Sequence, residues 1–82
     1  MAIYPNPAKK YFIVEYQLEK DAMDIQIEIL DMISRKVVEM TLHGQHDQVV
    51  VPVNNWHQGI YLVRLMANGR LMESRKVAVV DN

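Results

Sequence analysis

The sequence of 82 residues contains no cysteine, which excludes a disulfide framework, a thiolate metal site and thiol chemistry. It has no apolar run of the roughly 20 residues that a membrane-spanning helix needs. Its nine basic residues are balanced by ten acidic residues, so the chain as a whole does not attract nucleic acid or anionic membranes. We therefore expect no nucleic-acid partner.

The sequence also lacks a signal peptide, because no basic region followed by a long apolar stretch stands at its start. We expect that any export of this chain depends on a larger protein of which it is a part. Half of its residues (50%) are hydrophobic and the formal net charge is −1, which is typical of a folded domain. The length suffices for one hydrophobic core and not for two.

Motifs for catalysis are lacking as well: no GxGxxG, phosphate loop or GxSxG is present. The two serines, Ser34 and Ser74, do not stand in a nucleophile context. The pair His43 and His46 with Asp47 has residue types that bind zinc or nickel, but no third ligand is assured. We expect a solvated loop there, no cofactor and no enzymatic activity.

Alternating apolar and polar residues predict strands in segments 11–16, 23–30, 36–42, 49–53, 60–66 and 70–80. Apolar residues on both faces of 60–66 predict a central strand, and Pro52 indicates a sheet edge or a strand end. Asn68-Gly69 between two apolar runs predicts a hairpin. Six or seven short antiparallel strands with regular turns indicate an all-β sandwich or barrel.

The segment 24–40 fits a second interpretation, because its apolar residues also stand near helical spacing. A high content of β-branched residues and the internal Asp31-x-x-Ser34 favour two strands joined by a turn. In that turn we expect the Asp31 carboxylate to accept a hydrogen bond from a backbone amide ahead of it.

Three motifs follow one another in a fixed order: Tyr4-Pro5-Asn6-Pro7, Gly59-Ile60-Tyr61 and Arg75-Lys76-Val77. Together with Ile27-Glu28-Ile29-Leu30-Asp31 they resemble the C-terminal sorting domain of type IX secretion, also called the Por secretion system. The resemblance extends over residues 4–80. The chain departs from the family pattern at Ser34, where a glycine is usual, so we expect that turn to lack an easy positive φ.

The resemblance implies an immunoglobulin-like β-sandwich, with residues 1–82 as a single C-terminal sorting domain of a larger secreted protein of Bacteroidetes-type bacteria. It implies recognition by the type IX outer-membrane translocon and removal by a sortase-like protease. The covalently linked passenger would cross the periplasm and then be released or anchored on the cell surface. The residues that match the family's motifs, and that we expect to be recognised, are Pro5, Asn6, Pro7, Gly59, Tyr61, Arg75, Lys76 and Val77.

Several expectations concern side chains and edges. If Val77 and Val79 point inward, Lys76 and Ala78 face solvent. We expect Tyr61 and Trp56, which stands where the family usually has leucine, to be buried; an exposed Trp56 would favour a carbohydrate-binding or adhesion sandwich instead. Any self-association should run through a strand edge, with 70–80 exchanged between two copies in a homodimer.

Overall fold

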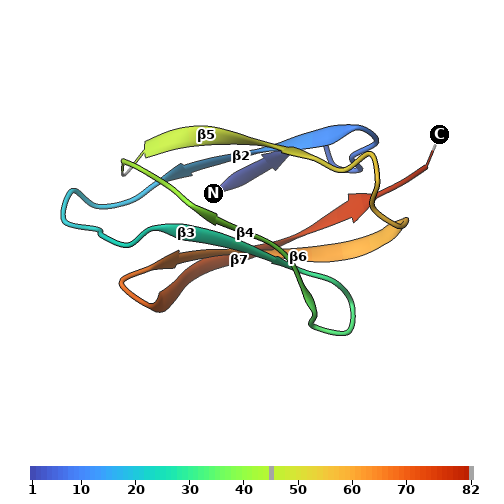
Figure 1. Cartoon of the computed structure of the whole chain (residues 1–82). Coiled ribbons are helices and arrows are strands. Elements are labelled where there is room, and N and C mark those ends of the chain that lie inside the picture. Colours follow the sequence, from blue (N-terminus) through green and yellow to red (C-terminus); the bar gives the residue numbers. More distant parts are fainter. Residues whose placement is uncertain (45, 82) are drawn as a thin grey trace.

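The computed structural model describes residues 1–44 and 46–81, without the side chain of His46. Its strands are β1 (Ala2–Tyr4), β2 (Tyr11–Gln17), β3 (Gln26–Leu30), β4 (Lys36–Thr41), β5 (His46–Pro52), β6 (Gly59–Ala67) and β7 (Arg70–Val79). A three-stranded sheet in the order β1-β2-β5 faces a four-stranded sheet in the order β4-β3-β6-β7, and all paired strands are antiparallel (Figure 1). The predicted all-β, immunoglobulin-like sandwich is confirmed, and the residues described include no helix.

The core lies between the two sheets, where every second side chain of a strand points inward. β2, β3 and β6 supply most of it, and the largest fully buried side chains are Tyr16, Phe12, Ile27, Ile29, Leu65, Val14, Val51, Val53, Val63 and Val77. The two interpretations of segment 24–40 are thereby resolved. Of its alternating isoleucines, Ile27 and Ile29 lie in β3 and Ile25 directly precedes it, and the chain turns into β4 where a helix would have continued.

The hairpin predicted at Asn68-Gly69 joins β6 to β7. Asn68 and Gly69 have φ values of 54° and 74°, the left-handed conformation at both central positions of a type I′ turn. The Asn68 side chain accepts the amide of Met23 at 3.2 Å, and the Asn68 amide donates to the Met23 carbonyl at 2.8 Å. The hairpin is therefore tied to the connection between β2 and β3.

The turn between β3 and β4 contains a serine in a backbone conformation that the sequence did not lead us to expect. The Asp31 carboxylate accepts the amides of Ile33 at 3.0 Å and Arg35 at 2.9 Å, as predicted for that residue type. Ser34 nevertheless has a φ of 66°, so the expectation that this turn lacks a positive φ is wrong. The reason is that the Asp31 carboxylate and carbonyl hold the turn closed, with the Ser34 amide donating to that carbonyl at 3.0 Å.

The first strand of the chain, β1, is not predicted by the alternation pattern. It is only three residues long and pairs with β2, placing Ile3 opposite Val14. Such a short segment carries too few residues to show a period of two. Both peptide bonds to proline that follow it, Tyr4-Pro5 and Asn6-Pro7, are cis.

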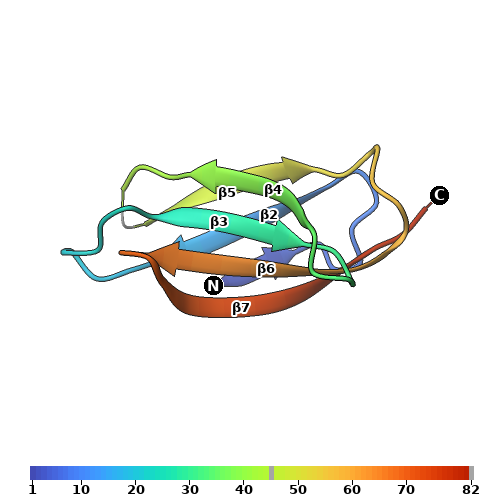
Figure 2. The same ribbon diagram turned by 60° about the horizontal axis from the view of Figure 1, so that its bottom comes forward.

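The connections gather at two ends of the sandwich (Figure 2). The β2–β3 and β6–β7 connections lie at one end. At the other, which we call the C-terminal end, lie the β1–β2, β3–β4 and β5–β6 connections and the end of β7. The motifs singled out in the sequence are all close to this second end.

Candidate recognition surface

Two of the three motifs are side by side because β6 and β7 are paired. Gly59 lies opposite Val79 and Tyr61 lies opposite Val77 in that pair. The late Gly-x-Tyr motif and the closing basic-valine motif therefore share the C-terminal end of one hairpin. β6 is a central strand, between β3 and β7, as its apolar residues on both faces predict.

The third motif, Pro5-Asn6-Pro7, closes the outer edge of β7. The Asn6 side chain accepts the amide of Ala78 at 3.0 Å and lies 3.4 Å from the carbonyl of Lys76, to which it donates. Ala8 continues the contact, donating to the carbonyl of Ala78 at 2.8 Å and accepting the amide of Val80 at 2.9 Å. Segment 6–8 thus occupies backbone groups that the end of an edge strand would otherwise expose.

Tyr61 fixes the connection that leads into β6. Its side chain is 7% exposed, and its hydroxyl donates to the carbonyl of His57 at 2.6 Å. A tyrosine that bonds the backbone a few residues upstream at the start of this strand is a recurrent feature of immunoglobulin-like sandwiches. Burial raises the pKa of Tyr61, and the negative charge of Asp31 raises it further, so the hydroxyl stays protonated and donates.

Trp56 packs beside Tyr61 but is only half-buried, so the prediction that both rings are buried is correct for Tyr61 alone. Its ring centroid lies 4.8 Å from that of Tyr61 and 6.1 Å from that of Phe12, the latter in an edge-on contact. The difference arises because Trp56 stands in the β5–β6 connection at the end of the sandwich, outside both sheets.

Neither the backbone conformation nor the packing at position 59 requires a glycine. The φ of Gly59 is not in the left-handed region, and a Cβ built there would meet no atom within 4 Å. Gly59 lines an open hollow beside Asp31, Ile33 and His57, with Tyr61 in its wall. The surface at Gly59 is therefore open to close approach by another molecule.

The basic pair is divided between two faces of β7. Val77 and Val79 are 0% and 2% exposed and point into the core, while Lys76 is exposed on the outer face, as predicted. Arg75 projects on the opposite face from Lys76, where it donates to the carbonyl of Met1 at 3.1 Å and pairs with Glu73 at 2.6 Å. Lys76 makes no ion pair with the residues that the structure describes.

The metal-ligand hypothesis centred on His43, His46 and Asp47 falls partly outside the described residues, because the His46 side chain is not among them. His57, on the β5–β6 connection, is remote from that loop (Figure 1). Among the described residues, no group of three or more His, Cys, Asp or Glu side chains is placed to hold a metal ion. The same residues form no helix that is long and apolar enough to cross a membrane.

The fold defines the chain as a small β-sandwich module, with three sequence motifs joined at one end. A sequence model of the family described as secretion system C-terminal sorting domain matches residues 2–80. The chain belongs to this family, and it is a C-terminal sorting signal for type IX secretion. Neither the curated proteins nor the solved structures gave a match.

Sequence reasoning missed the contribution of Ala8 and Ala78, which join the first motif to the last through backbone hydrogen bonds. Both residues are alanines, so neither has a functional group that would indicate a role in the contact. The contacts also connect positions about 70 residues apart in the chain, so no local spacing could have indicated them.

Proposed function

We propose that the C-terminal end of the sandwich is the surface by which the type IX outer-membrane translocon recognises this domain. The observation that carries the proposal is the joining of the three motifs: Asn6 bonds the edge of β7, and β7 pairs with β6 at Gly59 and Tyr61. Residues that are far apart in the chain thus form one continuous folded surface. A partner can recognise such a surface only when the domain is folded.

In this proposal residues 1–82 form a single sorting domain covalently linked to a passenger. The passenger crosses the periplasm, and a sortase-like protease then removes the domain, so that the passenger is released or attached to the cell surface. The domain itself performs no catalysis; its role is to present a surface. The roles of the matched residues differ: Tyr61 and Val77 are buried and hold the surface, while Pro5, Pro7 and Lys76 are exposed on it.

A carbohydrate-binding or adhesion sandwich is the second candidate, and the half-exposed ring of Trp56 is the observation that favours it. The ring lines an open hollow together with Asn55, His57 and Lys36, which are polar groups suited to sugar hydroxyls. Against this candidate, the neighbouring Tyr61 ring is buried and its hydroxyl already donates to a backbone carbonyl.

The proposal also includes self-association, in which two copies of the chain exchange the last strand, β7. The end of this strand is held by Asn6 and Ala8, so exchange must break those hydrogen bonds before they form again in the partner. Sedimentation at high concentration tests this: a dimer supports exchange, and a strictly monomeric profile contradicts it.

The experiment for the sorting function uses a reporter with a secretory signal peptide, followed by this chain. We expect the reporter on the cell surface or in the medium of a type IX-competent host, and in the periplasm of the same host lacking the translocon. A Gly59→Ala variant probes the surface directly, because a Cβ there meets nothing in the domain. Replacing a strand glycine by alanine should keep or raise stability by about 0.5–1 kcal/mol, whereas export should fall.

The carbohydrate candidate makes the opposite prediction. A Trp56→Ala variant would lose binding to immobilised polysaccharide while Gly59→Ala, where the added Cβ meets no atom of the domain, would keep it. Retention of the wild-type reporter in the periplasm of the competent host would contradict the sorting function itself.

A further inference from the structure

The basic side chains of this domain fall into two groups. Some make ion pairs within the domain: Arg35 with Asp31 at 2.8 Å, Lys36 with Glu28 at 3.1 Å, Arg64 with Glu28 at 3.7 Å and Arg75 with Glu73 at 2.6 Å. Lys9, Lys10, Lys20, Arg70 and Lys76 are exposed and make no ion pair with the described residues. Lys20 and Arg70 lie toward the opposite end, on the β2–β3 connection and at the start of β7. Lys9, Lys10 and Lys76 belong to the two segments that the Asn6 contact joins, and their charges are not balanced by an ion pair.

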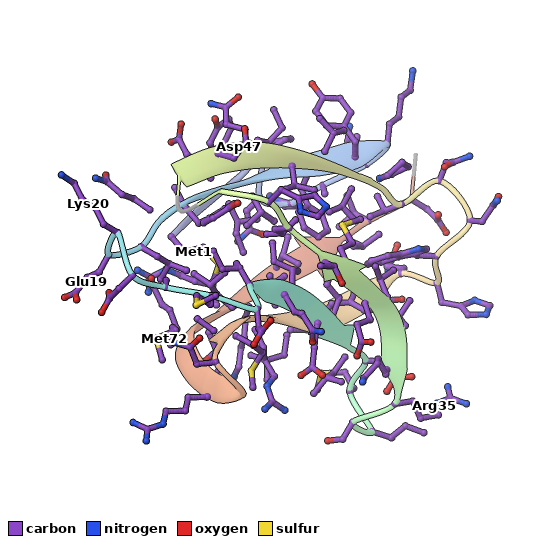
Figure 3. The ribbon with its side chains drawn as sticks, turned by 60° about the vertical axis from the view of Figure 1, so that its left-hand side comes forward. Met1, Glu19, Lys20, Arg35, Asp47 and Met72 are labelled. Atoms are coloured by element: carbon purple, nitrogen blue, oxygen red, sulfur yellow. The ribbon has the colours of Figure 1, made fainter. Side chains whose placement is uncertain are left out.

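Acidic side chains gather at the other end of the sandwich. Glu19, Asp21 and Asp24 are exposed on the β2–β3 connection, and Asp47 is exposed at the start of β5. Figure 3 shows Glu19 well separated from Arg35, which marks the β3–β4 turn. At the C-terminal end, Asp31 is already paired with Arg35, and Asp81 supplies one further carboxylate against the three lysines. A chain with a formal net charge of only −1 therefore has a basic end.

An open hollow adjoins this basic region. It is lined by Pro5, Pro7, Lys9, Lys10 and Tyr11. The prolines flank Asn6, whose side chain bonds β7, and the Tyr11 ring is 45% exposed. Two proline rings and an aromatic ring supply the apolar part of its lining, and the two lysines add positive charge.

The edge of β7 is bonded to the segment that lines this hollow, because Asn6 stands between Pro5 and Pro7. The amide and carbonyl of Ala78 point away from β6, since they bond Asn6 and Ala8. Because backbone groups alternate along a strand, those of Lys76 and Ser74 point the same way. Among the described residues, the outward amide of Lys76 and both outward groups of Ser74 meet no partner. A short length of open strand edge thus continues from the segment that Asn6 covers.

We propose that this edge and the adjoining hollow bind an extended acidic segment of a partner protein. The segment would add to β7 beside Ser74 and Lys76, by strand addition, and its carboxylates would face Lys76, Lys9 and Lys10. This inference rests on the proposed sorting function and specifies the chemistry of the partner. A peptide fits better than a phosphate or a lipid surface, because only a peptide backbone supplies hydrogen bonds for the open strand edge.

The test uses the chain labelled with nitrogen-15 and two synthetic peptides, one with aspartate and glutamate around a central leucine and one with asparagine and glutamine in their place. We expect the acidic peptide to shift the amide resonances of residues 6–11 and 74–80, with the affinity falling at least several-fold between 50 and 200 mM salt. The amide-bearing peptide should bind at least tenfold more weakly. Equal binding of both peptides, or shifts located elsewhere, would overturn the proposal.

The matched variants are Lys9→Glu with Lys10→Glu, and Lys20→Glu as the control at the opposite end. The first should weaken binding of the acidic peptide at least tenfold, and the control less than twofold. All three side chains are exposed, so these changes should leave folding intact. Vesicles containing phosphatidylglycerol form a third arm; binding to them without binding to the acidic peptide would contradict the peptide as occupant.

Export of the reporter separates this inference from the proposed function. If the wild-type domain directs export but does not bind the acidic peptide, the sorting function stands and the partner chemistry is wrong. If the acidic peptide binds at residues 6–11 and 74–80 while the reporter stays in the periplasm, the binding surface stands and the sorting function fails.

Discussion

Substitution of Asn6 by alanine tests the contact that joins the first motif to the last. The change removes one side chain that accepts the Ala78 amide at 3.0 Å and donates to the Lys76 carbonyl at 3.4 Å. A typical intramolecular hydrogen bond contributes about 0.5–1.5 kcal/mol net to stability, and the longer of these two contributes least. We expect Asn6→Ala to lower the free energy of unfolding by about 1–2 kcal/mol.

For a domain of this size a loss of 1 kcal/mol lowers Tm by about 4–8 °C, so a shift of about 4–16 °C is expected. Urea titration followed by tryptophan fluorescence measures the midpoint, because Trp56 packs on the core beside Tyr61. Asn54→Ala serves as the matched control, since the exposed Asn54 side chain makes no hydrogen bond with the described residues. Its effect should stay within about 0.5 kcal/mol.

Amide hydrogen exchange gives the local readout for the same variant. The Ala78 amide is protected by the Asn6 side chain alone, so it should exchange much faster in Asn6→Ala, while the buried pair of Tyr61 and Val77 keeps its protection. An unchanged urea midpoint together with a still-protected Ala78 amide would refute the reasoning. It would mean that Asn6 does not hold the edge of β7.

Other predictions follow from single positions. Tyr61→Phe should cost about 1 kcal/mol through the lost bond to the His57 carbonyl, and Tyr61→Ala about 3–5 kcal/mol through the emptied core site, both read from urea midpoints. Ser34→Gly should raise the free energy of unfolding by about 0.5–1 kcal/mol, because Ser34 holds a left-handed φ of 66°; a loss of stability would contradict this. The hydrogen bond from the Arg35 amide, with further hydrogen bonds and the charge of Arg35, lowers the pKa of Asp31. The charged carboxylate therefore stabilises the fold above the ordinary carboxyl pKa, and this stabilisation is lost as the pH falls through the lowered pKa. The difference in Tm between wild type and Asp31→Asn should therefore shrink from pH 6 to pH 2, and a constant difference would contradict that cause.

Much of the fold follows from patterns that are local in the sequence. Ile27 and Ile29 alternate with polar neighbours, and the strand they predict is β3, with both side chains fully buried. Asn68-Gly69 predicts its hairpin because few other residues accept two successive positive φ angles. These features need no knowledge of distant residues, and the structure confirms them.

The features that were missed depend on contacts between distant parts of the chain. The pairing of Asn6 with β7 joins residues separated by 72 positions, and no periodicity encodes it. Burial of Trp56 was overestimated because hydrophobicity does not tell whether a connecting segment lies between the sheets or at their end. Ser34 has a positive φ because hydrogen bonds to Asp31 offset a local preference against it.

The central claim is that a partner recognises the exposed residues of the motifs, and that these residues are not merely required for folding. Export and thermal unfolding of Arg75→Ala with Lys76→Ala, measured on the same reporter fusion and the same domain, test it most directly. Lys76 is exposed and makes no ion pair with the described residues, so the single Lys76→Ala change should alter stability by no more than about 0.5 kcal/mol. Arg75 is exposed but bonds the Met1 carbonyl and Glu73, so the double variant should still melt cooperatively, at a Tm somewhat below that of the parent. Removing charges that face a complementary partner can cost several kcal/mol of binding, so export should fall for Lys76→Ala and fall further for the double variant. Normal export of the double variant, or loss of folding in Lys76→Ala, would contradict the account.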